Sequence, residues 1–209
     1  VVDLSLVCRT DTLERPLATM KYAMKVCYDG ASFSGFQRQP TQPTVQGHLE
    51  KALGKLFAEK IELTAAGRTD TGVHGSGQVV AFETVKELPV QAVVEGTNGR
   101  LGDSLAILKA ATLAPNTDFH PRYSARSRTY HYYIFLEAGA RERVFWSGRA
   151  WCLGESPDRE LMAKAAEVFI GEHDFKTYTA RCDMPHFRRE IYELTVSTVS
   201  TSPRILVVK

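Results

Sequence analysis

A carboxylate stands among small residues in AGRTDTGVHGSG, residues 66–77. Held at the end of a strand without bulky neighbours, Asp70 can serve as a nucleophile or a base, and Arg68 two positions earlier favours its charged form. The structural alternative is an aspartate that caps a turn between two strands, and spacing alone favours that alternative. Composition cannot decide between the two interpretations.

Phosphate and metal chemistry fit this stretch poorly. Its glycines match neither G-x-x-x-x-G-K-[ST] nor G-x-G-x-x-G, and the pattern after them is that of a strand. Asp70 and His74 have no further ligand residues nearby in the sequence. GEHDF, residues 171–175, contains a His-Asp pair familiar from metal phosphohydrolases, but a single pair at a helix end more often makes capping hydrogen bonds. The sequence therefore favours neither a phosphate cradle nor a metal site at this stretch.

Residues 119–136, FHPRYSARSRTYHYYIFL, are rich in arginine and tyrosine and contain no acid. KTYTARCDMPHFRR, residues 176–189, repeats the mixture with one acid. Guanidinium groups bind phosphates and aromatic rings stack on unpaired bases, so these stretches suit RNA. The plainer alternative is a strand with a solvated basic face. The side chains concerned in the first stretch are Arg122, Arg126, Arg128, Tyr123, Tyr130, Tyr132 and Tyr133.

The overall composition is that of an ordinary globular protein. The 209 residues are 44% hydrophobic and 24% charged, and the net charge of +2 means that any nucleic-acid surface must be a local patch. No apolar run approaches the roughly 20 residues that span a bilayer, so we expect a cytoplasmic location. Four cysteines lie far apart without a C-x-x-C pair and are expected to be reduced and structural: Cys8, Cys27, Cys152 and Cys182.

Periodicity in the first half predicts strands interleaved with helices. Residues 21–30 alternate as a strand, and a polar loop follows. A helix begins after Thr44, with apolar residues at helical spacing up to Phe57. IELTAAG and QVVAFET read as strands on either side of the Asp70 stretch, followed by a weaker helix near 89–100 and a strand in LAILKAATL.

The second half continues this alternation. SRTYHYYIFL and the closing runs REIYELTVSTVS and RILVVK read as strands. Ser156, Pro157 and Asp158 begin a helix that Gly171 ends. The expected fold class is α+β with mostly antiparallel neighbours and a boundary near 114–120. The stripe of this last helix that we expect to be buried consists of Leu161, Met162, Ala165, Val168 and Phe169.

Five motifs together resemble the tRNA pseudouridine synthase A family. They are YDGASFSGFQRQ, TVQGHLEKAL, AAGRTDTGVHGSGQVVAF, DFHPRYSARSRTYHYYI and GEHDF, in the family's order and at about its spacings. The similarity runs from about Met20 to Lys209. It implies the pseudouridine synthase fold, with mixed, mostly antiparallel sheets and flanking helices in two related halves.

The resemblance implies a cofactor-free isomerase that converts uridine to pseudouridine in the anticodon stem-loop of tRNA. Asp70 occupies the position of the aspartate that attacks the target nucleotide, a role that a carboxylate at a sugar carbon can fill as in retaining glycosidases. Arg68 corresponds to the arginine that assists extrusion of the base from its stack. Tyr130 corresponds to the tyrosine that packs against that base, although without the resemblance we would favour ordinary packing on a strand face. Arg122, Arg126 and Arg128 become candidates for phosphate contacts, and the family is homodimeric.

The ends of the chain depart from the family. We expect an atypical extension over 1–19, an N-terminal half over 20–115 that carries the aspartate, and a truncated C-terminal half over 116–209. In the family, a strand like RILVVK is followed by a segment resembling F-L-x-x-M-V-R, whose basic residue pairs with the catalytic aspartate, and nothing here matches it. The alternatives are therefore a tRNA-binding protein with impaired catalysis and a related synthase with another RNA target.

Overall fold

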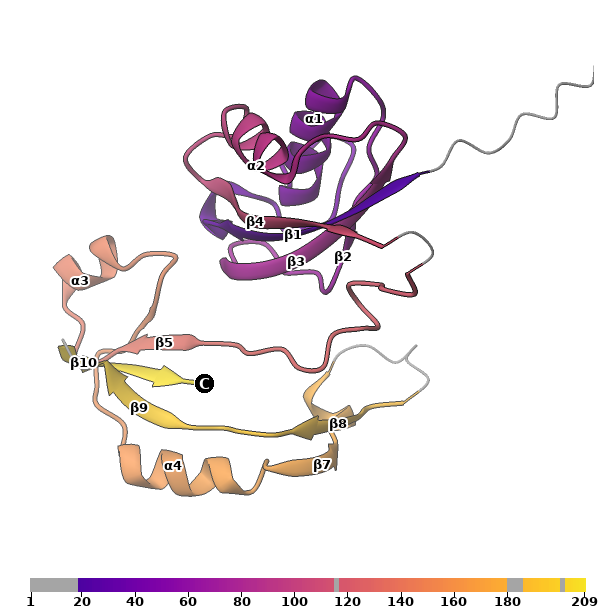
Figure 1. Cartoon of the computed structure of the whole chain (residues 1–209). Coiled ribbons are helices and arrows are strands. Elements are labelled where there is room, and N and C mark those ends of the chain that lie inside the picture. Colours follow the sequence, from indigo (N-terminus) through magenta and orange to yellow (C-terminus); the bar gives the residue numbers. More distant parts are fainter. Residues whose placement is uncertain (1–18, 115–116, 180–185, 200–201) are drawn as a thin grey trace, which may run out of the picture. The chain divides into compact units, whose positions relative to one another are not determined.

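The chain divides into two compact units, one reaching to Ala125 and the other spanning Arg126–Lys209. A computed structural model describes residues 19–114, 117–179, 186–199 and 202–209 (Figure 1). Cys8, Cys182 and all of the expected N-terminal extension except Thr19 lie outside the described residues. Within the described ranges, no helix is long and apolar enough to cross a membrane.

The N-terminal unit is a four-stranded antiparallel sheet with two helices on one face (Figure 1). The order of its strands is β2-β3-β1-β4. The core lies between the helices and the sheet, and Tyr22, Leu53 and Val93 are fully buried in it. The elements are β1 (Met20–Tyr28), η1 (Gly30–Ser32), α1 (Val45–Phe57), β2 (Thr64–Ala65), β3 (Gly75–Thr84), α2 (Val90–Asn98) and β4 (Leu105–Leu113).

Local chemistry explains the two strongest elements of this unit. In β1 every second side chain from Tyr22 to Tyr28 is buried, which confirms the alternation seen in the sequence. The Thr44 side chain caps α1 by accepting a hydrogen bond from the Gly47 N–H at 3.3 Å. The helix ends at Ala58, whose φ of 56° is left-handed. The helix predicted near 89–100 and the strand predicted in LAILKAATL are confirmed as α2 and β4.

The C-terminal unit contains a second four-stranded sheet, of order β6-β5-β10-β9, and a separate pair formed by β7 and β8. Among its described residues, every strand pair is antiparallel except β5 with β6. The described residues therefore form an α+β fold with mostly antiparallel sheets, as predicted. The elements are β5 (Tyr132–Phe135), α3 (Ala140–Phe145), β6 (Trp151–Cys152), α4 (Arg159–Glu167), β7 (Gly171–Asp174), η2 (Lys176–Tyr178), β8 (Arg188–Ile191), β9 (Val196–Val199) and β10 (Ser202–Val208).

The buried stripe predicted for α4 is wrong in most of its members. Leu161 and Val168 are exposed by 64% and 72%, and Ala166 is the residue of this helix that is buried. Met162 is partly buried against the small cluster of Ile134, Leu136 and Leu206. A periodic pattern shows which side of a helix is apolar. It does not show how much sheet surface is available to bury that side. Here Met162 is the member of the predicted stripe that packs against a buried cluster of the described unit.

Two further predictions for this unit need correction. The strand expected from Ser127 begins only at Tyr132, because the ladder between β5 and β10 starts with the pair Tyr132 and Val208. The first four residues of GEHDF, Gly171–Asp174, form β7, which pairs with β8, so the His-Asp pair lies in a strand. Its side chains still make local hydrogen bonds, since the His173 ring contacts the Ile170 carbonyl at 2.9 Å.

Candidate functional site

Asp70 lies in the loop that connects β2 to β3. The strands pair Thr64 with Ala81 and Ala65 with Val80, and the Ala66 N–H then donates to the Val79 carbonyl at 2.8 Å. These contacts make the two strands a hairpin and fix the base of the loop. The sequence prediction of a strand on either side of Asp70 is confirmed, although β2 is only two residues long.

The tip of this loop is a turn closed by backbone groups. The Val73 N–H donates to the Asp70 carbonyl at 3.2 Å, and Gly72 has a φ of 81°, a value that glycine adopts at little cost. The side chains of Arg68 and Asp70 are both exposed. Among the described residues, the Asp70 carboxylate makes no hydrogen bond or ion pair, with Arg68 or with any other group. The capping role that spacing alone favoured is thus not seen.

The end of β1 and the segment after it, residues 28–36, contact the Asp70 loop and hold it in place. We call these residues the brace. The Phe36 N–H donates to the Thr69 carbonyl at 2.9 Å, and the Tyr28 and Thr69 hydroxyls share a hydrogen bond of 2.9 Å. On the far side of the turn, the Nδ1 of His74 lies 3.2 Å from a carboxylate oxygen of Asp29. The Gly30 N–H approaches the same ring nitrogen at 3.3 Å. Residues 28–36 and the Asp70 loop are therefore in contact on both sides of Asp70.

Two glycines of the bracing segment allow this close approach. A Cβ on Gly30 would lie 2.2 Å from the Val73 carbonyl oxygen, well inside any tolerable contact. Gly35 has a φ of 88°, and a Cβ there would lie 3.1 Å from the Thr69 carbonyl oxygen. Sequence reasoning described residues 31–44 only as a polar loop and missed this brace. The signal was present in Phe33 and Phe36, which are buried although they stand in a loop rich in glycine and serine.

The other predicted site residues lie on an exposed segment that crosses the boundary between the units. Arg122 belongs to the N-terminal unit, where its guanidinium lies 5.9 Å from the centre of the Tyr123 ring. Arg126, Arg128 and Tyr130 belong to the C-terminal unit and precede β5. All three are exposed, Tyr130 by 69%, so Tyr130 does not pack on a strand face.

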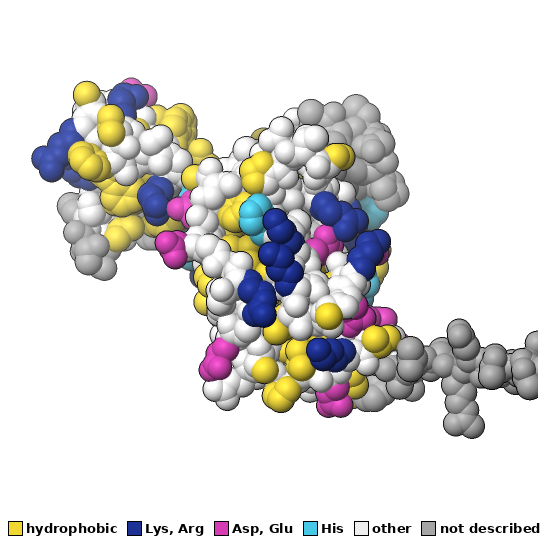
Figure 2. Space-filling view, turned by 90° about the horizontal axis from the view of Figure 1, so that it is seen from above, with side chains coloured by type: hydrophobic (Ala, Val, Ile, Leu, Met, Phe, Trp, Pro, Cys, Tyr) yellow, Lys and Arg dark blue, Asp and Glu magenta, His cyan; other side chains and the backbone are white. Residues whose placement is uncertain are grey.

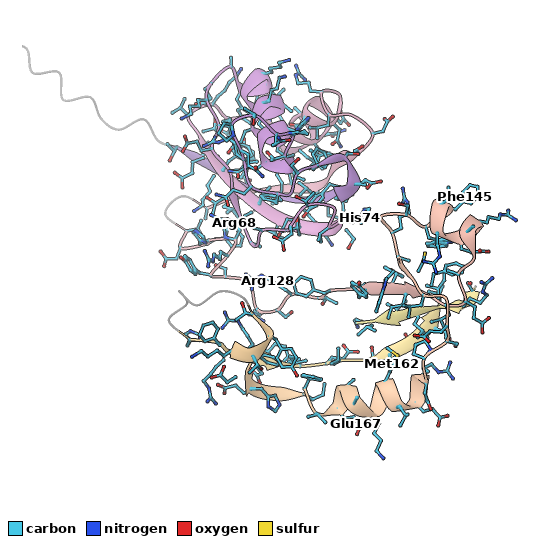
Figure 3. The ribbon with its side chains drawn as sticks, turned by 180° about the vertical axis from the view of Figure 1, so that it is seen from behind. Arg68, His74, Arg128, Phe145, Met162 and Glu167 are labelled. Carbon is cyan, nitrogen blue, oxygen red and sulfur yellow. The ribbon has the colours of Figure 1, made fainter. Side chains whose placement is uncertain are left out.

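The structure thus brings together two of the predicted residues, Arg68 and Asp70, on one loop. Figure 3 labels Arg68 and His74 along the margin of the N-terminal unit away from its helices, and labels Arg128 in the other unit. On the helical face, Figure 2 shows Lys and Arg side chains scattered among neutral, hydrophobic and acidic ones. The described residues contain no group of three His, Cys, Asp or Glu side chains that could hold a metal ion.

Known proteins share this chain's sequence pattern. The tRNA pseudouridine synthase family matches over residues 24–124, which include the brace and the Asp70 loop. A protein of Shewanella frigidimarina named tRNA pseudouridine synthase A is 41% identical over 179 residues, covering 85% of this chain and 67% of that protein. Proteins of the same name from Nitrosomonas eutropha and Thermosipho africanus are 41% and 38% identical, with 63% and 72% of their lengths covered.

These similarities place the molecule among the pseudouridine synthases as a class. The chain belongs to the tRNA pseudouridine synthase family. It spans between 63% and 72% of the length of the three relatives. The resemblance seen in the five sequence motifs is confirmed.

Proposed function

We propose that this chain isomerises uridine to pseudouridine in tRNA, with Asp70 as the nucleophile and no cofactor. The observation that carries this proposal is that Asp70 has an exposed carboxylate on a fixed backbone. Its carboxylate is exposed and without a partner among the described residues, whereas the backbone on both sides of it is held by hydrogen bonds. A nucleophile needs this combination of fixed position and open access. The three relatives carry a name that states the activity.

The chemistry is a transfer within one nucleotide. A carboxylate oxygen of Asp70 bonds to the sugar carbon as the bond from that carbon to the uracil nitrogen breaks, as in retaining glycosidases. The detached uracil turns and its C5 bonds to the same sugar carbon, which releases the carboxylate. The hydrogen on C5 leaves as a proton and the freed nitrogen takes one up, so no oxidant or reductant is needed.

The base must leave its stack before Asp70 can reach the sugar. Base extrusion costs a few kcal/mol, and we propose that the guanidinium of Arg68 assists it. The exposed ring of Tyr130 is proposed to stack on the extruded uracil, and Arg122, Arg126 and Arg128 to contact phosphates. Their exposure on a segment without acids supports these roles. The target within tRNA is proposed to be the anticodon stem-loop.

The assembly and the location are part of the same proposal. We propose a homodimer that binds one tRNA across both subunits and acts in the cytoplasm. A dimer allows a chain with a net charge of only +2 to present several basic patches to one RNA. Light scattering of the purified protein tests this part, since a mass near 23.3 kDa at working concentration would contradict it.

A second candidate function is binding of tRNA without turnover. One observation favours it, namely that most of the exposed arginines and tyrosines suited to RNA lie on residues 119–136, apart in the sequence from the Asp70 loop. Catalysis requires every group of the active site, whereas RNA binding through exposed arginines and tyrosines can persist without some of them.

Release of tritium from tRNA labelled at uracil C5 separates the two candidates. Isomerisation must expel that hydrogen, so the first proposal expects release in proportion to pseudouridine formed. Binding of the same tRNA, measured by filter retention, with no release at stoichiometric protein would support the second candidate. Mapping of modified positions in total RNA then tests the tRNA target, because pseudouridine confined to another RNA would contradict it.

A further inference from the structure

Thr69 is held from two directions at the point where the Asp70 turn begins. Its carbonyl accepts a hydrogen bond from the Phe36 N–H, and its side-chain hydroxyl shares one with the Tyr28 hydroxyl, both at 2.9 Å. The next residue is Asp70, whose carbonyl closes the turn. Any rotation of the Thr69 backbone would swing the Asp70 carboxylate, because the two residues share a peptide bond.

Tyr28 is itself firmly placed. It is the last residue of β1, it is only 5% exposed, and its ring lies 6.1 Å from the ring of Phe36. Its partner across the ladder is Gly75, where a Cβ would fall 2.5 Å from the Tyr28 ring. The ring thus occupies space left by a glycine just beyond the Asp70 turn. Its hydroxyl reaches Thr69, 41 positions away along the chain.

The hydroxyl of Tyr28 remains protonated at neutral pH. Burial raises the pKa of Tyr28 above its ordinary value, against a smaller lowering by hydrogen bonds with the Thr69 and Gln78 side chains. A protonated phenol can donate or accept a hydrogen bond, so its bond to the Thr69 hydroxyl persists at neutral pH.

We propose that Tyr28 is a positioning residue that holds the Asp70 carboxylate in its reactive place through the hydroxyl of Thr69. This inference rests on the proposed function for its kinetic part. Tyr28 does not touch the substrate. It acts on the turn that carries Asp70. Loss of the Tyr28 hydroxyl therefore lowers the rate of the chemical step and leaves tRNA binding unchanged.

The variant Tyr28→Phe tests this inference, because it keeps the ring and removes the hydroxyl. We expect kcat to fall about tenfold with KM for tRNA within twofold. Thr69→Val is expected to do the same and Thr69→Ser to restore most of the rate. The double variant Tyr28→Phe with Thr69→Val is expected to be no slower than the slower single variant, because each change already removes the bond between the Tyr28 and Thr69 hydroxyls.

Tyr22→Phe is the matched control. Tyr22 lies on the same face of β1 and is fully buried, and its hydroxyl bonds to the backbone of Leu88. Its removal perturbs the same sheet without touching the Asp70 loop. We expect kcat of Tyr22→Phe within twofold of the parent chain. An equal fall in both variants would overturn the inference, since it would show a general effect of a lost buried hydroxyl.

Amide hydrogen exchange gives a readout that does not depend on turnover. The Phe36 N–H donates to Thr69, and we expect its exchange to quicken about fivefold in Tyr28→Phe but not in Tyr22→Phe. Unchanged exchange in Tyr28→Phe would overturn the inference, and so would faster exchange with unchanged kcat. If the parent chain releases no tritium, the proposed function fails, and exchange at Phe36 alone then decides whether Tyr28 holds the turn.

Discussion

The two units differ in how they use their apolar residues. In the described part of the N-terminal unit, one continuous core joins β1, β3, α1 and α2. In the described part of the C-terminal unit, the buried hydrophobic residues other than Ala166 form two clusters of three, and Phe145 and Val168 are exposed by more than 70%. The carboxylate that needs a fixed position stands on the first unit, and most of the candidate RNA contacts stand on the second. Our proposal thus places the chemistry on the unit with the continuous core.

Core truncations test this difference most strongly. Leu53→Ala in α1 is expected to destabilise its unit by about 3–5 kcal/mol, because a fully buried leucine leaves a cavity that a continuous core cannot close. Leu206→Ala in β10 is expected to cost about 2–3 kcal/mol, because a small cluster can collapse around the gap. Hydrogen exchange read separately in α1 and β10 measures both. Equal or reversed costs would remove the contrast between the units.

Gly30→Ala disrupts the contact between the brace and the Asp70 loop and leaves the hydrophobic core residues unchanged. A Cβ at this position would lie 2.2 Å from the Val73 carbonyl, so the two segments must separate and Asp70 must move. We expect kcat for tRNA to fall about a hundredfold, which is about 2.7 kcal/mol. Gly102→Ala is the control, because its Cβ would meet nothing within 4 Å. Comparable losses in both variants would show that the close approach at Gly30 has no special effect.

Tyr130→Ala tests the exposed segment. If the ring stacks on the target base, its loss is expected to reduce kcat/KM for tRNA about tenfold, or about 1.4 kcal/mol. The stability of the C-terminal unit should change by less than about 0.5 kcal/mol, because Tyr130 is exposed. Tyr192→Ala removes an equally exposed ring from the same unit and should leave kcat/KM within twofold. A similar effect of both changes would contradict a specific role for Tyr130.

The smallest expected effects concern the arginines. Replacing Arg126 or Arg128 by glutamine should weaken tRNA binding modestly and lower the slope of log affinity against log salt by about 0.7–0.9 for each phosphate that is no longer neutralised. Arg159→Gln, at the exposed start of α4, should leave the slope unchanged. Filter binding across a salt series measures the slope. An unchanged slope in Arg126→Gln and Arg128→Gln would remove these side chains from the set that binds phosphate.

The elements with strong local patterns could be predicted from the sequence. The alternation from Tyr22 to Tyr28 and the spacing after Thr44 are set by burial on one side, so β1 and α1 follow directly. The brace could not be predicted in this way. Contacts such as Tyr28 with Thr69 and Gly30 with His74 join residues 41 and 44 positions apart, and only the folded sheet brings them together.

In the C-terminal unit, the sequence pattern predicted burial that the structure does not show. Leu161 and Val168 fit a buried stripe by spacing, yet burial depends on the surface available opposite them and not on spacing alone. For the candidate site, the exposure of Arg68 and Asp70 fits the roles that the resemblance implied, although those roles stay predictions. The closing of the turn by backbone rather than by the Asp70 side chain was not visible in the sequence.

The central claim is that Asp70 is the group that attacks the nucleotide. Asp70→Asn keeps the shape of an exposed side chain that has no partner among the described residues, so folding should be unchanged. The decisive measurement is tritium release from C5-labelled tRNA by the parent chain and by Asp70→Asn at stoichiometric protein. We predict release by the parent chain and at least a thousandfold slower release by the variant, with tRNA affinity within a few fold. Release by Asp70→Asn at a rate close to that of the parent chain would contradict the account.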